Sequence, residues 1–365
     1  MKIKTIISLL EKWAPPAYQE SYDNSGLLIG DKHADCTGCL ITLDTIESVI
    51  DEAIEKGCNL IVSHHPIIFG GLKKITGRNY VERTVLKAIK NDIAVYAIHT
   101  NLDNVHTGVN RKICDLIGLS SPKILAPKSN VLKKLTVFVP TSAAESVQNA
   151  LFDSGAGSIG NYKECSFSTT GTGTFRPGQK SNPTIGTAGG EREAVEEQKI
   201  EFLINGHETQ LILARLFESH PYEEVAYFLT DLDNNHREVG SGMVGELEKP
   251  VDTLDFLKDL KTKMNISFIR HTAVYKKSVQ RIAVCGGAGG FLLSAAKTAG
   301  ADLFITSDYK YHEFFDADSQ IVIADIGHYE SEAFTKELIY DFFTENLVNI
   351  AFYSSKVNTN PINYL

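Results

Sequence analysis

The sequence predicts an α/β core domain with a parallel or mixed sheet, interrupted by an inserted α+β domain. Strand and helix patterns alternate in the first third of the 365 residues, and the same alternation returns in the last third. The middle follows a different pattern. Strands separated by helices pair in parallel. We therefore predict a discontinuous core at residues 1–127 and 272–365, with an insert at residues 128–271.

Short apolar runs rich in β-branched residues mark the strands of the core. In the first third they are Cys39–Asp44 (CLITLD), Asn59–Ser63 (NLIVS) and Ile93–His99 (IAVYAIH). Helical periodicity between them covers residues 45–57 and 81–90. In the last third the predicted strands are residues 281–285, 302–306 and 321–325, followed by a long helical pattern over 332–345.

The middle of the chain predicts an α+β arrangement. Strand patterns cover residues 135–140, 200–204 and 226–232, and helical patterns cover 144–154 and 208–217. Residues 168–194 are rich in Gly, Ser and Thr, and this composition predicts an extended loop because it buries little apolar surface.

Composition and charge exclude several classes of protein. The net charge is -9, and basic residues form only short pairs such as Lys133-Lys134, so we expect no nucleic-acid partner. The spacing of Ile3, Ile6, Ile7 and Leu10 predicts an amphipathic helix rather than a signal peptide. No apolar stretch is long enough to cross a bilayer, and we predict a cytoplasmic protein.

Histidines and carboxylates follow several predicted strands at the point where each strand ends. They include His64 and His65 after one strand, Asp103 shortly after the next, and His328 and Glu332 after the last. Ligands of open α/β sheets bind beyond the carboxyl ends of the strands. We therefore expect these five side chains to converge on one cleft.

The residue types and their number indicate two divalent metal ions. Imidazole and carboxylate suit zinc, iron or manganese, and zinc is the first choice. Five ligands are too many for one catalytic zinc with an open position, and they suit two metals that share a carboxylate and a water. Asp103 is the predicted bridge, since it has two oxygens. His99 is predicted to transfer protons or to support a ligand.

The glycine-rich turn Cys285–Gly290 (CGGAGG) allows two interpretations. It lies between a predicted strand and a predicted helix, so its backbone N–H groups can bind a phosphate. Alternatively, the glycines permit a tight turn with close backbone packing. The turn is not a dinucleotide fingerprint, because Leu292 stands where the third glycine belongs.

The same residues carry a resemblance to a known family. His64-His65-Pro66, His99-Thr-Asn-Leu-Asp103 and Gly327-His328-Tyr-Glu-Ser-Glu332 resemble the metal-site motifs of the GTP cyclohydrolase 1 type 2 homologues, the Nif-three-like family. Residues 22–30 resemble its N-terminal motif. Residues 308–312 resemble its next-to-last motif, with Asp308 at a usual Glu and Tyr311-His312 at a usual His pair.

The resemblance implies more than the residues show. It assigns metal binding to His64, His65, Asp103, His328 and Glu332, and it implies a homo-oligomer, a hexameric ring. The insert is similar to the ferredoxin-like, CutA-like insert of long family members, with Ser219–Glu224 as its most recognisable part. The family name implies a hydrolase acting on a small molecule such as a nucleotide. The alternatives are a non-enzymatic, metal-binding regulatory ring protein and a hydrolase of other phosphoesters.

Overall fold

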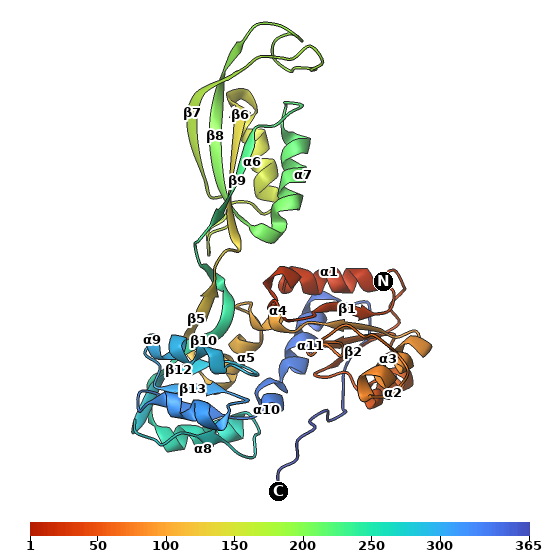
Figure 1. Cartoon of the computed structure of the whole chain (residues 1–365), viewed down its shortest axis with the longest axis vertical. Coiled ribbons are helices and arrows are strands. Elements are labelled where there is room, and N and C mark those ends of the chain that lie inside the picture. The colour runs from red at the N-terminus through yellow and green to blue at the C-terminus, as the bar shows by residue number, and fades with distance from the viewer. The chain divides into compact units, whose positions relative to one another are not determined.

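The computed structural model describes all 365 residues, which form two compact units (Figure 1). The larger unit comprises Met1–Ala126 and Glu238–Leu365, and the inserted unit comprises Pro127–Arg237. The insert therefore ends well before the predicted residue 271. The reason is strand β10 (His236–Asp252), which pairs with β12 (Ser278–Val284) of the larger unit. The unit boundary therefore lies within a strand, just after its start, and not in a loop.

The first sheet of the larger unit is mixed and carries the N-terminal third of the chain. Its strand order is β1-β4-β3-β2-β15. The strands are β1 (Gly26–Ile29), β2 (Cys39–Thr42), β3 (Leu60–Ser63), β4 (Ala94–Ala97) and β15 (Phe352–Ser354). All neighbours are parallel except β1, which is antiparallel to β4. Every residue of β2, β3 and β4 is buried, as continuous apolar runs predict for a sheet covered on both faces.

Amphipathic helices cover this sheet. They are α1 (Ile3–Trp13), α2 (Glu47–Glu55), α3 (Tyr80–Lys90) and α11 (Thr335–Asn346). Val49 and Ile50 of α2 and Val85 of α3 pack in one apolar cluster with Leu40 and Val95 of the sheet. The apolar positions of α1 expected from its periodicity, Ile3, Ile6, Ile7 and Leu10, are all buried.

A second mixed sheet carries the C-terminal third, where the prediction did not separate two sheets. Its order is β11-β14-β13-β12-β10-β5. Besides β10 and β12, it contains β5 (Ser120–Lys128), β11 (Arg270–His271), β13 (Leu303–Thr306) and β14 (Val322–Asp325). Strands β12, β13 and β14 are parallel. Helices α5 (Val109–Ile117) and α8 (Thr253–Lys263) pack with one apolar cluster of this sheet, and α9 (Leu293–Thr298) packs with another.

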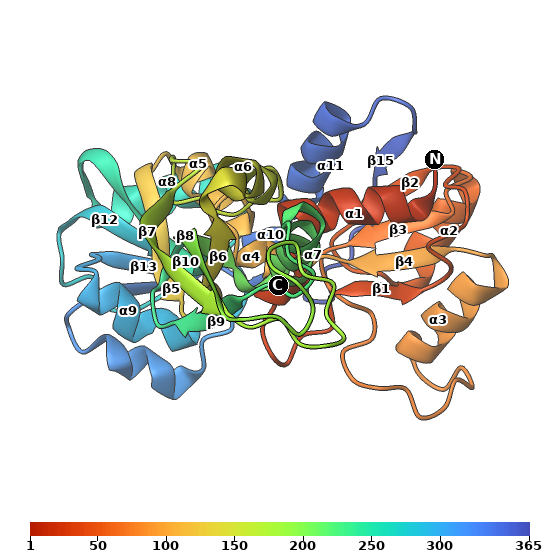
Figure 2. The same cartoon turned by 90° about the horizontal axis from the view of Figure 1, so that it is seen from above.

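The two sheets lie side by side in the larger unit, with the short helix α10 (His328–Glu332) between them (Figures 1 and 2). The predicted helical pattern over 332–345 therefore belongs to two helices, α10 and α11. Another short helix, α4 (Thr100–Asp103), follows β4. These two short helices position the residues described below. No helix in the structure has both the length and the apolar character needed to span a membrane.

The inserted unit is a four-stranded antiparallel sheet with the order β7-β8-β6-β9. Its elements are β6 (Leu132–Pro140), α6 (Ala144–Asp153), β7 (Ser166–Phe175), β8 (Glu193–Asn205), α7 (Thr209–Ser219) and β9 (Tyr227–Leu232). This βαββαβ connection is the ferredoxin-like arrangement. Both helices pack against the sheet through one apolar cluster that includes Val147, Ile212 and Phe202. A closer relation to CutA stays a prediction.

One loop prediction in the insert is wrong at its ends and confirmed over residues 176–192. Residues 168–194 were expected to be an extended loop, but residues 168–175 belong to β7. All of β7 pairs with β8. Nearly all of β7 is exposed, so it has no apolar alternation for sequence analysis to detect. Its threonines favour strand geometry, and backbone hydrogen bonds to β8 hold it in place.

Candidate metal centre

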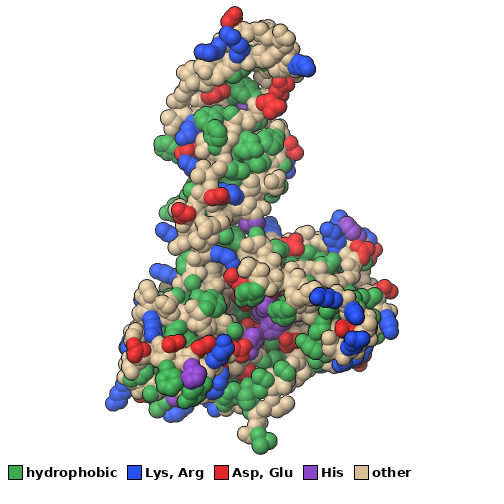
Figure 3. Space-filling view, viewed as in Figure 1, with side chains coloured by type: hydrophobic (Ala, Val, Ile, Leu, Met, Phe, Trp, Pro, Cys, Tyr) green, Lys and Arg blue, Asp and Glu red, His purple; other side chains and the backbone are tan.

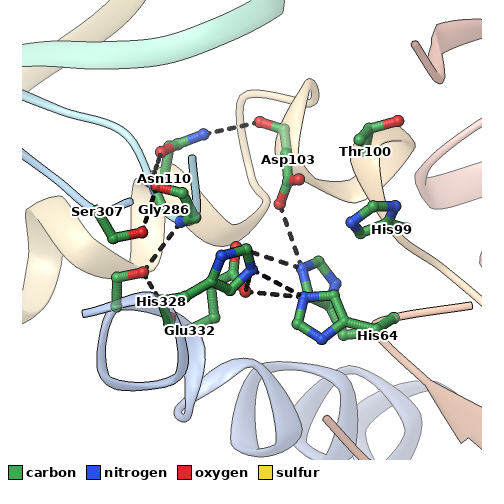
Figure 4. A network of polar contacts seen from close by, with 12 residues as sticks. His64, His99, Thr100, Asp103, Asn110, Gly286, Ser307, His328 and Glu332 are labelled. Atoms are coloured by element: carbon green, nitrogen blue, oxygen red, sulfur yellow. Dashed lines mark hydrogen bonds and ion pairs between the residues drawn. The ribbon is translucent and has the colours of Figure 1, made fainter. Parts of the chain in front are cut away.

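All five predicted ligands lie together between the two sheets of the larger unit. His64 and His65 follow β3, Asp103 ends α4, and His328 and Glu332 begin and end α10. Figure 4 shows His64, Asp103, His328 and Glu332 pointing toward one another. Their ligand atoms fall into groups within 4.8 Å: His64, Asp103 and Glu332 in one, and His65, His328 and Glu332 in another. The carboxyl ends of parallel strands from two separate sheets therefore supply one centre.

Glu332 is the carboxylate that spans the two groups. Its Oε2 lies 3.0 Å from Nε2 of His65 and 3.2 Å from Nε2 of His328. Its Oε1 lies 3.9 Å from Nε2 of His64. Asp103 was the predicted bridge, but its Oδ1 lies 3.6 Å from His64, and Asp103 belongs to one group only. In the structure Glu332 lies between the two groups, a position that the spacing of these residues in the sequence does not show.

Two buried atoms of the centre fit a cation and lack any other partner. The ring of His64 is fully buried, and its Nδ1 lies 2.8 Å from the carbonyl oxygen of Ile98. Since that nitrogen donates to the carbonyl, Nε2 carries a lone pair. Nε2 faces Oδ1 of Asp103, and neither atom has a hydrogen-bond partner. Two acceptors that face each other without a proton are costly when buried, and a metal ion would satisfy both.

Each of the other histidines is held from behind by a carboxylate. Nδ1 of His65 lies 2.7 Å from Oδ1 of Asp44, and Nδ1 of His328 lies 2.8 Å from Oδ2 of Asp308. The same arrangement recurs at His99, where Nδ1 lies 2.7 Å from Asp23. Such carboxylates fix the ring orientation of metal-ligating histidines and leave Nε2 directed at the ion.

These supporting carboxylates were not assigned a role from the sequence. Asp44 directly follows Leu43 at the carboxyl end of β2, so the strand-end argument that selected the ligands would also have selected Asp44. Asp23 and Asp308 lie within motifs quoted for the family resemblance. Tyr311 and His312, which stand at the family's usual His pair, are exposed and belong to none of the metal groups.

His99 lies at the edge of the centre. Its ring centroid is 5.3 Å from those of both His64 and His65, and it forms a third possible metal group with them. Since Asp23 holds Nδ1, Nε2 is the nitrogen able to exchange protons with a bound water. His220, by contrast, is a buried residue of the insert whose nitrogens contact Phe138 and Tyr222.

Burial and charge shift the pKa values of the centre in the metal-free protein. Burial and then the charge of Glu332 raise the pKa of Asp103 to about 7. Burial alone would lower the pKa of His65, but hydrogen bonds to Asp44 and Glu332 outweigh it and raise that pKa to about 9. The pKa of His328 rises to about 11, because Glu332 and Asp308 outweigh its burial.

We expect the metal-free protein to lose stability as the pH rises from 6 to 9. The pKa of His65 is 6.5 ordinarily and about 9 when folded, so its contribution is complete below pH 6.5 and disappears as the pH rises through 9. The pKa of Asp103 is 3.8 ordinarily and about 7 when folded, so its contribution to stability is also lost as the pH rises, between about 4 and 7. Urea unfolding of metal-stripped protein measures this trend, and a stability that increases over the range would contradict it.

The glycine-rich turn packs against the centre, and three of its N–H groups donate within the protein. The N–H of Gly286 donates to Asn110, that of Gly287 to Ser331, and that of Gly289 to Thr306. Gly287 has φ +63°, and a Cβ there would lie 2.5 Å from Oε1 of Glu332. Of the two interpretations of residues 285–290, the structure favours close backbone packing.

Gly287→Ala is therefore expected to disturb the centre. The variant should lose about 1–2 kcal/mol of stability from backbone strain, and zinc affinity should fall roughly tenfold or more because Glu332 is displaced. Gly300→Ala is the matched control, since Gly300 has φ +72° and nothing within 4 Å of the added Cβ. Equal zinc affinity in the two variants would show that Gly287 does not position Glu332.

The centre opens into a cavity of about 990 Å³ in the larger unit. His65, His99, Asp103, His328 and Glu332 all line it. The space-filling view shows histidine side chains gathered in this hollow (Figure 3). A small molecule can therefore reach the ligand atoms directly.

Fold and site together define a candidate metal-binding α/β protein with an inserted α+β unit. The chain belongs to the Duf34/NIF3 (NGG1p interacting factor 3) family, which matches residues 1–361 and confirms the resemblance.

Relatives and solved structures agree with this membership. A Halalkalibacterium halodurans protein named GTP cyclohydrolase 1 type 2 homolog is 38% identical over 99% of this chain and 98% of its own length. A Bacillus subtilis protein of the same name is 37% identical over the same shares, 99% and 98%. The structure of a Bacillus cereus protein related to NIF3 has a TM-score of 0.87 at 36% identity, covering 100% of this chain and 99% of that one. Staphylococcus aureus SA1388 gives 0.79 at 31% identity, with the same coverage of 100% and 99%.

Proposed function

We propose that the protein is a metal-dependent hydrolase with two divalent ions per chain. The observation that carries the proposal is the buried, unpartnered pair of acceptors on His64 and Asp103, set beside a Glu332 whose second oxygen faces His65 and His328. His64, Asp103 and Glu332 would hold one ion, and His65, His328 and Glu332 the other. Zinc is the first choice for this set of nitrogen and oxygen donors, followed by iron and manganese.

The chain's own residues have separate roles in this proposal. When bound, the two ions would lower the pKa of a water molecule and so supply hydroxide near neutral pH. Asp44 and Asp308 hold the rings of His65 and His328 in place. His99, paired with Asp23, accepts or returns a proton at the edge of the centre. The cavity admits a small molecule, and the predicted substrate is a nucleotide.

The proposal is tested on metal-stripped protein reloaded with zinc, iron(II) or manganese. We expect about two equivalents of metal by elemental analysis, and metal-dependent turnover in a panel of GTP, other nucleotides and simple phosphoesters. Two equivalents without turnover of any compound would instead favour the non-enzymatic, metal-binding regulatory protein. Failure to take up metal would contradict both.

His99→Gln is expected to separate proton transfer from metal binding. The variant should keep its metal content, because the five predicted ligands are unchanged and His99 is not one of them. Turnover should fall roughly 10²-fold or more, the usual effect of losing a general acid–base group. A fall in metal content would instead make His99 a ligand, consistent with its group with His64 and His65.

Two further proposals rest on the family resemblance. They are a homo-oligomer that is a hexameric ring, and a CutA-like character of the inserted unit. A cytoplasmic location is proposed from the sequence pattern alone. Light scattering of the full chain measures the oligomer directly.

A further inference from the structure

We infer that the substrate is a planar heteroaromatic compound with at most one phosphate, such as a base, a nucleoside or a nucleoside monophosphate, rather than a nucleoside triphosphate. The inference rests on the proposed hydrolase and narrows its substrate. It is drawn from the charges and the aromatic side chains that line the cavity.

The cavity contains no Lys or Arg side chain. Apart from histidines, its charged lining residues are all acidic: Glu20, Asp44, Glu47, Asp103 and Glu332. Glu47 pairs with Arg83, whose Nε lies 2.8 Å from Oε2 of Glu47. Arg83 itself does not line the cavity. Sites for polyphosphates place Lys, Arg or free backbone N–H groups around the phosphates. Besides the metal ions, this lining therefore offers no cation to phosphates beyond the one that the metal centre can hold.

The surroundings do not supply the missing cations. In the glycine-rich turn, the N–H groups of Gly286, Gly287 and Gly289 donate to side chains of the protein and are not free to bind a phosphate. A neighbouring hollow, which shares Ala288 and Phe291 with the cavity, contains Lys297 and Lys310. Its lining also holds four carboxylates, from Asp308, Glu313, Asp316 and Asp318. Acidic groups therefore outnumber basic ones there too.

Exposed aromatic side chains give the cavity an affinity for flat rings. Tyr22, Phe69, Tyr80 and Phe291 line it, and each exposes more than half of its surface, between 56% and 69%. The ring of Phe69 lies 5.7 Å from that of His99 in an edge-to-face arrangement. A planar heterocycle stacks on such rings, and stacking does not require a charged partner.

The test is a series of guanosine, GMP, GDP and GTP bound to zinc-loaded full-length protein. Zinc content is measured first, because protein that takes up no zinc would contradict the proposed function itself. Calorimetry then gives each affinity, or kcat/KM replaces it for a compound that is turned over. We expect the highest value for guanosine or GMP, and no gain from the second and third phosphates. GTP binding at least tenfold tighter than GMP, or no binding of any of the four, would overturn the inference.

Variants test the two features separately. Phe69→Ala and Phe291→Ala should each weaken guanosine binding about tenfold, whereas Phe167→Ala, at an equally exposed ring of the inserted unit, should not. Ser48 is exposed at the rim of the cavity, and Ser48→Lys should raise the affinity for GTP relative to guanosine, while Ser48→Gln should not. Unchanged guanosine binding in both Phe variants would also overturn the inference.

Discussion

Glu332→Gln is expected to weaken zinc binding at both positions of the centre, by roughly 10²–10³-fold. Glu332 is 2% exposed, and its two oxygens face His64 on one side and His65 and His328 on the other. Removing one member of a buried charged group costs about 3–5 kcal/mol, which corresponds to that change in affinity. Turnover should fall with the metal content. Competition with a chelator measures the affinity.

A matched substitution controls for the loss of a charge near the centre. Glu337→Gln makes the same change on α11 at an exposed residue, and it should leave zinc affinity and turnover unaltered. The amide of Gln is nearly the same size as the carboxylate, so the folded structure should persist in both variants. Loss of one equivalent with the other fully retained would contradict the placement of Glu332 between two ions.

Asp103→Asn is expected to have opposite effects on metal binding and on stability. The variant should lose the ion held by His64, Asp103 and Glu332, keep the other, and lose turnover by about 10²–10³-fold. In metal-free protein, burial and Glu332 raise the pKa of Asp103 to about 7, so above this pH the folded state contains an unfavourable buried charge. The Asn amide removes that charge and can donate to Nε2 of His64, which has no partner. The metal-free variant should therefore melt at a higher temperature than metal-free wild type at pH 8.

Asp115→Asn provides the comparison for Asp103. Asp115 is exposed on α5 and pairs with Arg111, so its replacement should change stability by less than about 0.5 kcal/mol and leave metal content intact. Thermal melting with and without zinc, together with elemental analysis, measures both effects. A metal-free Asp103→Asn protein that is less stable than wild type would show that the carboxylate supports the fold.

The sequence was sufficient to predict which five side chains converge, because parallel strands impose a strong pattern. The continuous apolar runs of β2, β3 and β4 fix where each strand ends, and His64 and His65 stand directly after β3. The order of residues along the chain does not show how far apart two sheets lie. The position of Glu332 between two groups of histidines and the contact of Asp23 with His99 therefore could not be predicted. Both depend on side chains meeting across long separations in sequence, as His65 and Glu332 do 267 residues apart.

The incorrect predictions have a similar origin. Strand β7 is exposed and β10 crosses a unit boundary, so neither follows the burial pattern that sequence analysis detects. The glycine-rich turn fitted both a phosphate cradle and close packing until the partners of Gly286 and Gly287 were known. Local sequence therefore predicts elements well, whereas the pairing of polar groups needs the three-dimensional structure.

Anomalous diffraction from crystals of the zinc-loaded full-length protein tests the central claim most directly. Data collected on both sides of the zinc absorption edge locate the ions without assumptions about ligands. We predict two anomalous peaks per chain, one among His64, Asp103 and Glu332 and one among His65, His328 and Glu332. Zinc-loaded crystals with no peak beside Glu332 would contradict the account.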